Sequence, residues 1–167
     1  ADAYGEAFAA FAHDEWGWGV DTGRIAMVAD VMAGVSEAIG LLTRPGGTVI
    51  VNPPVYPPFF GYSERIGRTT VDAPLGPDGR LDLDAIEHAY RTAPRDGGIV
   101  HLLCSPHNPT AVVHTRAELE AVAALAGEHG VSVVVDEIHA PLVPGGFVPY
   151  LSVAGSESAI VATSAAK

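Results

Sequence analysis

Short, continuous apolar runs alternate with amphipathic segments along most of the chain. The apolar runs that predict strands lie at 25–31, 48–51, 68–73, 99–103, 131–135 and 159–163. The segments whose apolar positions recur at helical spacing lie at 2–15, 34–42, 82–92 and 115–129. Strands without polar alternation are typical of sheets covered on both faces. The pattern therefore predicts an α/β fold with a mostly parallel sheet and helices on both faces.

Capping and breaking residues sharpen several boundaries. Asp82 is the expected N-cap of its helix, and Thr115 with Glu118 forms a capping box that opens the next one. Gly130 is the expected stop of that helix. The proline-rich stretch 52–59 predicts a shaped loop rather than regular structure.

Composition and charge exclude several classes of protein. With 167 residues, 48% hydrophobic and 17% charged, the chain suits one ordered domain and not a disordered tail. A net charge of −11 argues against nucleic acid or an anionic membrane as a partner. The single cysteine, Cys104, excludes an internal disulfide and fits a reducing, cytoplasmic compartment. No apolar run reaches the length of a membrane span.

Polar residues follow the predicted strands, where parallel sheets place their ligands. These residues are Asn108, Asp136, His139, Ser164 and Lys167. Because the carboxyl ends of parallel strands share one edge, we expect these side chains to converge. Each of them also has a simpler interpretation as a helix cap, a turn residue or a solvated surface group.

Two of these residues have chemistry that suits an aldehyde cofactor. A carboxylate at Asp136 would favour the protonated form of a ring nitrogen. The amine of Lys167 would form a Schiff base with an aldehyde if it is neutral part of the time. The alternatives are a surface acid and a solvated lysine.

Three further sites are candidates for binding a flat, phosphorylated ligand. Asn108, between prolines, offers a fixed amide donor, although Asn-Pro is also an ordinary turn signal. Tyr56 would stack on a planar ring or simply pack. The segment Gly34-Val35-Ser36 is expected to open a helix, whose free amides would hold a phosphate. Any helix start has such amides.

The sequence contains little that indicates a metal site and none of the common nucleotide-binding motifs. Cys104 with His107, and Asp136 with His139, are close in sequence, but no second cysteine pair or His-Glu-x-x-His accompanies them. No metal site is predicted. A Walker A loop, a Gly-x-Gly-x-x-Gly and a Gly-x-Ser-x-Gly elbow are also missing from the sequence.

Taken in order, the motifs resemble one enzyme family. They are Gly34-Val35-Ser36, Pro54-Val55-Tyr56-Pro57-Pro58-Phe59, Ser105-Pro106-His107-Asn108-Pro109-Thr110, Asp136-Glu137-Ile138-His139-Ala140 and Ser164-Ala165-Ala166-Lys167. This series resembles the large domain of the fold-type I aminotransferase superfamily, whose enzymes use pyridoxal 5′-phosphate. The residues within these motifs are most similar to the cystathionine β-lyase branch known as MalY/PatB. The resemblance runs from about Trp18 to Lys167.

The resemblance implies a role for each candidate. Lys167 would be the Schiff-base lysine and the proton-transfer base, and Asp136 would pair with the pyridinium nitrogen. Asn108 would donate to the phenolic oxygen, with His139 nearby, and Tyr56 would stack on the ring. The phosphate would be held by Gly34, Val35, Ser36 and Ser164.

The sequence also departs from the family pattern. The family continues Asn-Pro-Thr with glycine, and here Ala111 follows, which is strained if that position needs a positive φ. Pro141 stands where an acid is common, and Ala33 where proline is common. Residues 1–167 are interpreted as part of the cofactor-binding large domain. Relatives add an N-terminal arm, a small domain and the arginine that holds the substrate carboxylate.

The implied activity is β-elimination on a sulfur amino acid such as cystathionine, giving pyruvate, ammonia and a thiol. The first alternative is a class I/II aminotransferase, and the second is a non-catalytic cofactor-binding or regulatory domain. The resemblance also implies a homodimer whose partner residues complete each site. Residues 1–167 alone are expected to show little or no turnover.

Overall fold

A five-stranded parallel sheet forms the centre of the computed structural model, which describes residues 2–143 and 145–166. The strands are β1 (Thr48–Val51), β2 (Thr69–Asp72), β3 (Ile99–Cys104), β4 (Ser132–Asp136) and β5 (Ile160–Ala162). Their order across the sheet is β2-β1-β3-β4-β5, and every neighbouring pair is parallel. The α/β fold predicted from the apolar runs is confirmed.

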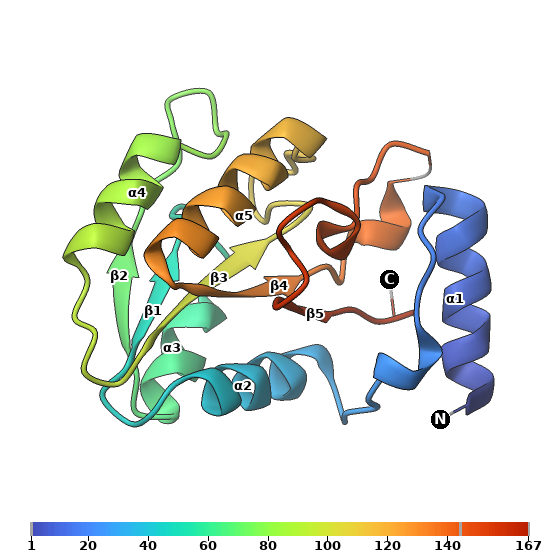
Figure 1. Ribbon diagram of the computed structural model, residues 1–167, viewed down its shortest axis with the longest axis horizontal. Helices are drawn as coiled ribbons and strands as arrows, with labels where there is room; N and C mark the ends of the chain where they lie inside the picture. The colour runs from blue at the N-terminus through green and yellow to red at the C-terminus, as the bar shows by residue number, and fades with distance from the viewer. Residues whose placement is uncertain (1, 144, 167) are drawn as a thin grey trace.

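Helices cover both faces of this sheet (Figure 1). The helices are α1 (Asp2–Trp16), α2 (Val31–Leu42), α3 (Pro58–Arg65), α4 (Leu83–Thr92) and α5 (Arg116–His129). Short 3₁₀ turns lie at Thr22–Arg24, Ala140–Leu142 and Tyr150–Ser152. Helices α4 and α5 lie on one face of the sheet, and α2 and α3 on the other. The result is a three-layer arrangement with the sheet in the middle.

Two hydrophobic cores hold the layers together, one on each face of the sheet. One core joins the α4 and α5 side chains, such as Ile86 and Leu119, to β-strand residues such as Val133. The other joins Val35 of α2 and Phe59 of α3 to the opposite face of the sheet. Because successive strand residues point to opposite faces, the unbroken apolar runs fill both cores at once.

The predicted caps of the two best-defined helices are confirmed. The Asp82 side chain accepts a hydrogen bond from the amide of Ala85 at the start of α4. At α5, Thr115 and Glu118 make both hydrogen bonds of the capping box, and Gly130 ends the helix with a φ of 62°.

Three local predictions are wrong. Residues 25–30 form no strand, because Asp30 caps α2, and that helix begins at Val31 instead of Gly34. Val28 instead packs against α2, where a Cβ at Gly34 would lie 3.0 Å from its Cγ2 atom. The proline-rich loop also ends early, since Pro58 is the first residue of α3 and proline is compatible with a first helical turn.

Helix α1 stands at the side of the sheet, beside the segment that follows β4 (Figure 1). Several of its contacts are aromatic. The Trp16 ring lies edge-on to Phe11 and to Phe147, with centroids 5.1 Å apart in both pairs. Phe8 makes similar contacts with Trp16 and Trp18. Such edge-to-face pairs stabilise packing beyond the area they bury.

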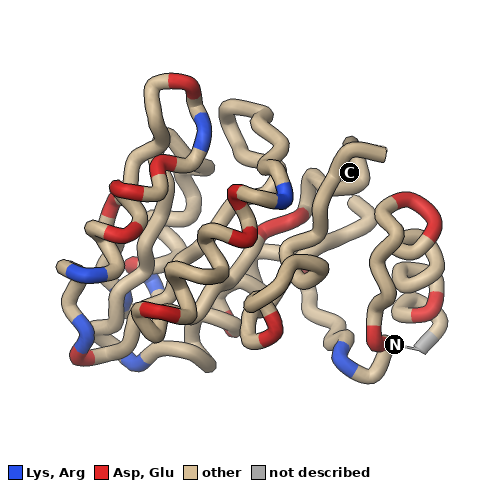
Figure 2. Tube along the Cα trace, turned by 45° about the horizontal axis from the view of Figure 1, so that its top comes forward, with Lys and Arg blue, Asp and Glu red and all other residues tan. Residues whose placement is uncertain are grey.

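Acidic residues occur at many positions along the chain trace and do not gather at one place (Figure 2). None of the helices in the described residues is long and apolar enough to cross a membrane.

Candidate functional site

A pocket of about 160 Å³ opens at the carboxyl ends of the central strands. Its lining residues are Val31, Met32, Tyr56, Cys104, Asn108, Asp136, Ile138 and His139. After β1 the chain turns to β2 on one side, and after β2 it returns to β3 on the other side of β1. Parallel sheets bind ligands outside the strand ends where the order reverses in this way. The structure therefore brings together Tyr56, Asn108, Asp136 and His139, four of the predicted site residues.

Asp136 is the last residue of β4 and is 5% exposed. Its Oδ1 atom accepts a hydrogen bond of 3.0 Å from the amide of Ile138. Burial raises the pKa of the carboxyl group, while that hydrogen bond and the nearby His139 partly oppose the shift. Within the described residues, no lysine or arginine forms an ion pair with Asp136. A cationic ligand atom would stabilise this carboxylate.

Asn108 lies in a tight loop between β3 and α5. The loop closes on itself, because the His107 amide donates to Val112 O and the Ala111 amide donates to His107 O, both at 2.8 Å. Ala111 has a φ of 57°, which makes it the one residue other than glycine with positive φ among those described. The strain anticipated at this position is present.

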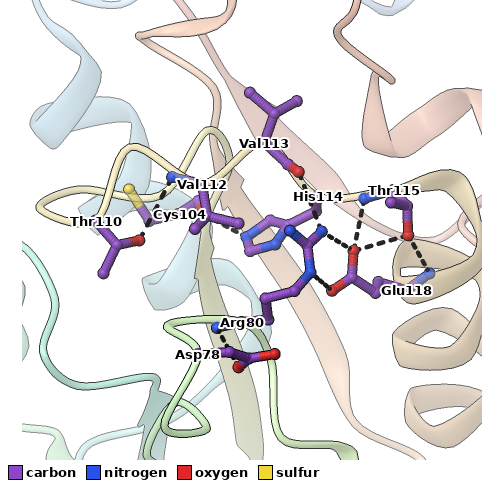
Figure 3. A network of polar contacts seen from close by, with 9 residues as sticks. All are labelled: Asp78, Arg80, Cys104, Thr110, Val112, Val113, His114, Thr115 and Glu118. Atoms are coloured by element: carbon purple, nitrogen blue, oxygen red, sulfur yellow. Dashed lines mark hydrogen bonds and ion pairs between the residues drawn. The ribbon is translucent and has the colours of Figure 1, made fainter.

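The far side of this loop is anchored by an ion pair between Arg80 and Glu118 (Figure 3). Glu118 also accepts hydrogen bonds from the backbone and hydroxyl of Thr115, and Arg80 also donates to Val113 O. Burial opposes ionisation of Glu118, but the hydrogen bonds from Arg80 and Thr115 outweigh it and lower the pKa to about 2. The first turn of α5 is thereby fixed relative to the loop that carries Asn108.

Tyr56 lies in the loop that joins β1 to α3. Its ring is half-buried and meets Phe59 edge-on, with centroids 5.6 Å apart. Phe59 is fully buried in the first turn of α3. The helix that the sequence did not predict therefore supports the ring that lines the pocket.

A buried chain of hydrogen bonds fixes the start of the Tyr56 loop. Asn52 follows β1, and its Nδ2 atom donates to Ala73 O at 3.1 Å. Asn52 Oδ1 lies 2.7 Å from His101 Nε2, and His101 Nδ1 lies 2.7 Å from the Tyr90 hydroxyl. Since the Asn52 oxygen can only accept, His101 carries its proton on Nε2 and Tyr90 donates to Nδ1. Burial lowers the pKa of His101 to about 3, so the ring is neutral at pH 7.

The residues predicted to hold a phosphate, Gly34, Val35 and Ser36, lie further into α2 than expected. The amide of Gly34 already donates to Asp30 O, and the Ser36 hydroxyl donates to Met32 O. Val35 is fully buried in the core. None of the three lines the pocket, because the first turn of α2 begins three residues earlier than expected. The residues that present the helix start to the pocket are Val31 and Met32.

Ser164 and Lys167 follow β5. Ser164 is half-buried, accepts a hydrogen bond of 3.1 Å from the Ala166 amide and is not among the residues that line the pocket. The neighbouring Thr163 hydroxyl donates to Glu137 O at 3.2 Å, which holds the end of β5 beside the end of β4. Lys167 lies outside the described residues.

Sequence reasoning missed several groups of the site. Val31, Met32, Cys104 and Ile138 form its walls. Asp30, a good N-cap residue directly before Val31, was the signal that marks the true helix start.

Burial, with Asp136 nearby, raises the pKa of the Cys104 thiol to about 12.

Glu137 was also missed, although it follows Asp136 directly. It is 1% exposed, and its Oε1 atom accepts a hydrogen bond of 2.7 Å from the Tyr150 amide. Burial raises its pKa to about 8, so the side chain is mostly protonated at pH 7. A polar residue inside a motif gave no signal of how deeply it is buried.

Metal-binding geometry is not found at this site. Among residues 2–143 and 145–166, no three His, Cys, Asp or Glu side chains are grouped as metal ligands.

Solved structures share this fold along nearly the whole chain. A putative pyridoxal-phosphate-dependent β-cystathionase from Corynebacterium diphtheriae superposes with a TM-score of 0.87 and 30% identity, covering 98% of this chain and 42% of that one. Cystalysin from Treponema denticola, which contains pyridoxal 5′-phosphate, gives a TM-score of 0.88 and 27% identity, covering 98% and 43%.

Sequence relatives agree with the structures. A putative cystathionine β-lyase from Mycobacterium leprae is 51% identical over 98% of this chain and 42% of its own length. The cystathionine β-lyase PatB of Bacillus subtilis is 34% identical over 96% and 42%. The chain thus spans about two-fifths of the length of these curated relatives. The family model described as aminotransferase class I and II matches residues 1–167, and the chain belongs to this family.

Proposed function

We propose that this chain forms the cofactor-binding part of a pyridoxal-phosphate-dependent C–S β-lyase that acts on sulfur amino acids. The observation that carries the proposal is Asp136, a buried carboxylate at the end of β4 in a pocket shared with Tyr56 and Asn108. The putative cystathionine β-lyase of Mycobacterium leprae and the cystathionine β-lyase PatB of Bacillus subtilis support the reaction type.

The residues present fit this cofactor. A buried carboxylate with no cation beside it within the described residues suits a protonated ring nitrogen, and binding would relieve the cost of its burial. When bound, pyridoxal phosphate supplies an electron sink that stabilises negative charge at the substrate α-carbon. Asp136 keeps the ring nitrogen protonated for this purpose.

The remaining pocket residues orient the ring. Tyr56 offers a half-buried aromatic face for stacking, and Asn108 offers an amide donor for the phenolic oxygen. His139 lies in the same pocket and adds a second polar group on that side. Together these groups would exclude water from one face of the ring.

The phosphate is assigned to the helix start at Val31 and Met32, with Ser164 as a hydroxyl donor. Amides in the first turn of a helix have no partners within that helix and favour an anion. Gly34, Val35 and Ser36 lie further into α2 and do not line the pocket.

Lys167 is proposed to bind the cofactor covalently until the substrate amine displaces it, and the freed lysine amine then acts as the base that removes the substrate α-proton. The β-carbon–sulfur bond then breaks, and the thiolate takes the electron pair and a proton. The remaining 2-aminoacrylate is hydrolysed to pyruvate and ammonia. Lys167 is the one lysine in residues 1–167, which makes the assignment simple to test.

Borohydride reduction of the complete protein with pyridoxal phosphate, followed by peptide mass spectrometry, is the direct test. We expect a pyridoxyl group on Lys167 and its loss in Lys167→Ala. Asp136→Asn should still be labelled but should bind the cofactor more weakly and lose most of its turnover. An unlabelled Lys167 in the wild-type protein would refute the assignment.

An aminotransferase is the second candidate, because a probable N-succinyldiaminopimelate aminotransferase of Mycobacterium tuberculosis is 36% identical over 68% of the chain. Both activities use the same pocket residues. Release of pyruvate from cystathionine without an amino acceptor supports the lyase. Turnover that requires a 2-oxo acid supports the aminotransferase, and binding without turnover supports a non-catalytic domain.

We also propose that the complete protein is a cytoplasmic homodimer. The single cysteine within residues 1–167 suits a reducing compartment, and light scattering with size-exclusion chromatography measures the number of subunits.

A further inference from the structure

His107 connects two loops of the site through one hydrogen bond. His107 is 2% exposed, and its Nε2 atom lies 2.9 Å from Pro54 O. A carbonyl oxygen can only accept, so Nε2 carries the proton and donates it. This bond joins the loop after β3 to the loop after β1.

The two joined loops carry the two groups that would face a planar ring. Asn108 is the next residue after His107, and Tyr56 lies two residues after Pro54. Both line the pocket. The His107 backbone is also held within its own loop, since its amide donates to Val112 O at 2.8 Å. His107 is therefore a point at which the two loops are tied together.

The surroundings of His107 argue against a role in moving protons. Its Nδ1 atom is buried and has no hydrogen-bond partner within the described residues. The His114 ring lies edge-on to it, with centroids 6.0 Å apart, and donates from Nε2 to Cys104 O at 3.1 Å. Burial lowers the pKa of both rings, that of His114 to about 4. Two neutral rings packed in this way act as structural donors.

We propose that His107 is a positioning residue that holds the Tyr56 ring and the Asn108 amide at the separation a planar cofactor requires. The proposal rests on the function proposed above. It goes beyond that function because His107 is not among the residues that line the pocket.

The test compares three variants of the complete protein. His107→Phe keeps a flat ring but removes the donor, and His107→Gln provides an amide donor close to the position of Nε2. His114→Phe is the matched control, because it removes a buried histidine donor from the same cluster without cutting the link to Pro54. If His107→Phe fails to fold, His107→Asn replaces it, since its shorter side chain does not reach Pro54 O.

The first readout is the dissociation constant for pyridoxal phosphate, together with the absorbance maximum of the bound cofactor. Loss of one buried hydrogen bond is worth about 1.4 kcal/mol, which corresponds to about tenfold weaker binding in His107→Phe. We also expect a shifted absorbance maximum. His107→Gln should recover to within about threefold of wild type, and His114→Phe should stay within the same range. Wild-type affinity and absorbance in His107→Phe, or equal weakening in His114→Phe, would overturn the proposal.

The second readout needs no cofactor. Amide hydrogen exchange in the cofactor-free protein should accelerate in both 53–60 and 105–112 in His107→Phe, and less in His107→Gln. Acceleration in 105–112 alone would mean that His107 does not hold the loop after β1, and the proposal would fail. If wild type binds no pyridoxal phosphate, the proposed function fails, while the exchange experiment still decides whether His107 joins the loops.

Discussion

Replacing Ala111 with glycine should stabilise the protein, although the same change normally weakens a protein. Ala111 has a φ of 57°, in the left-handed region where a Cβ atom crowds the following carbonyl oxygen. The side chain is exposed, so its methyl group contributes little packing. Glycine therefore removes the strain without leaving a cavity.

The magnitude follows from two opposing terms. An L-residue in the left-handed region costs roughly 1–2 kcal/mol, and glycine removes that cost. Glycine also makes the unfolded chain more flexible, which takes back roughly 0.5–1 kcal/mol. We expect Ala111→Gly to gain about 0.75 kcal/mol, the centre of a range of about 0–1.5 kcal/mol.

Ala124→Gly is the matched control, because Ala124 is exposed in the middle of α5. There the same change should cost about 1 kcal/mol. Urea unfolding of the complete protein, followed by circular dichroism, compares the midpoints of wild type and both variants. The two variants should shift in opposite directions. If both lose stability to the same extent, the reasoning about strain at Ala111 is wrong.

Three further predictions concern buried or half-buried polar groups. With its pKa at about 2 against an ordinary 4.5, Glu118 contributes stability above about pH 4.5 that is lost as pH falls towards 2. Glu118→Gln, which breaks the ion pair with Arg80, should cost about 1–2 kcal/mol at pH 7 and flatten the acid side of the melting-temperature profile. The pKa of Glu137 is shifted in the opposite direction, from an ordinary 4.5 up to about 8 in the folded protein. The free energy of unfolding therefore falls as pH rises between these two values. Glu137→Gln should gain about 1–3 kcal/mol at pH 8 in a thermal unfolding assay, and an unchanged melting temperature there would contradict the buried acid. Tyr90→Phe leaves His101 Nδ1 without a donor and should cost about 1–3 kcal/mol in urea unfolding, whereas a neutral result would show that the ring finds another partner.

The layered fold could be predicted because its signals are local. A buried parallel strand needs an unbroken apolar run, and the run at 48–51 matches β1 at both ends. The capping box of α5 is equally local, since Thr115 and Glu118 satisfy each other within one turn. Residues 25–30 misled because the apolar stretch ends at Asp30, which caps α2, and Val28 packs against that helix instead of pairing with a strand.

The site could be predicted only in part, because its groups come from separate loops. Asn108 follows β3 and Asp136 ends β4, so the strand pattern predicted that both residues lie at the same edge of the sheet. Both residues do line the pocket there. The displaced start of α2 moved the helix amides from Gly34 to Val31. Long-range bonds such as that of His107 to Pro54 join residues about fifty positions apart, and no local pattern reveals them.

The hydrogen-bond chain from Tyr90 through His101 to Asn52 has a consequence for how this sequence can change over generations. Every donor in it faces an acceptor, so no member can reverse its direction without leaving a neighbour unsatisfied. A single substitution leaves one buried polar group without a hydrogen-bond partner and lowers the stability of the protein. Replacing two partners together with apolar residues can be nearly neutral. Substitutions at these three positions are therefore expected to occur together in evolution, with strong epistasis between them. Measured fitness of single and double variants at Tyr90 and His101 should show this non-additivity directly.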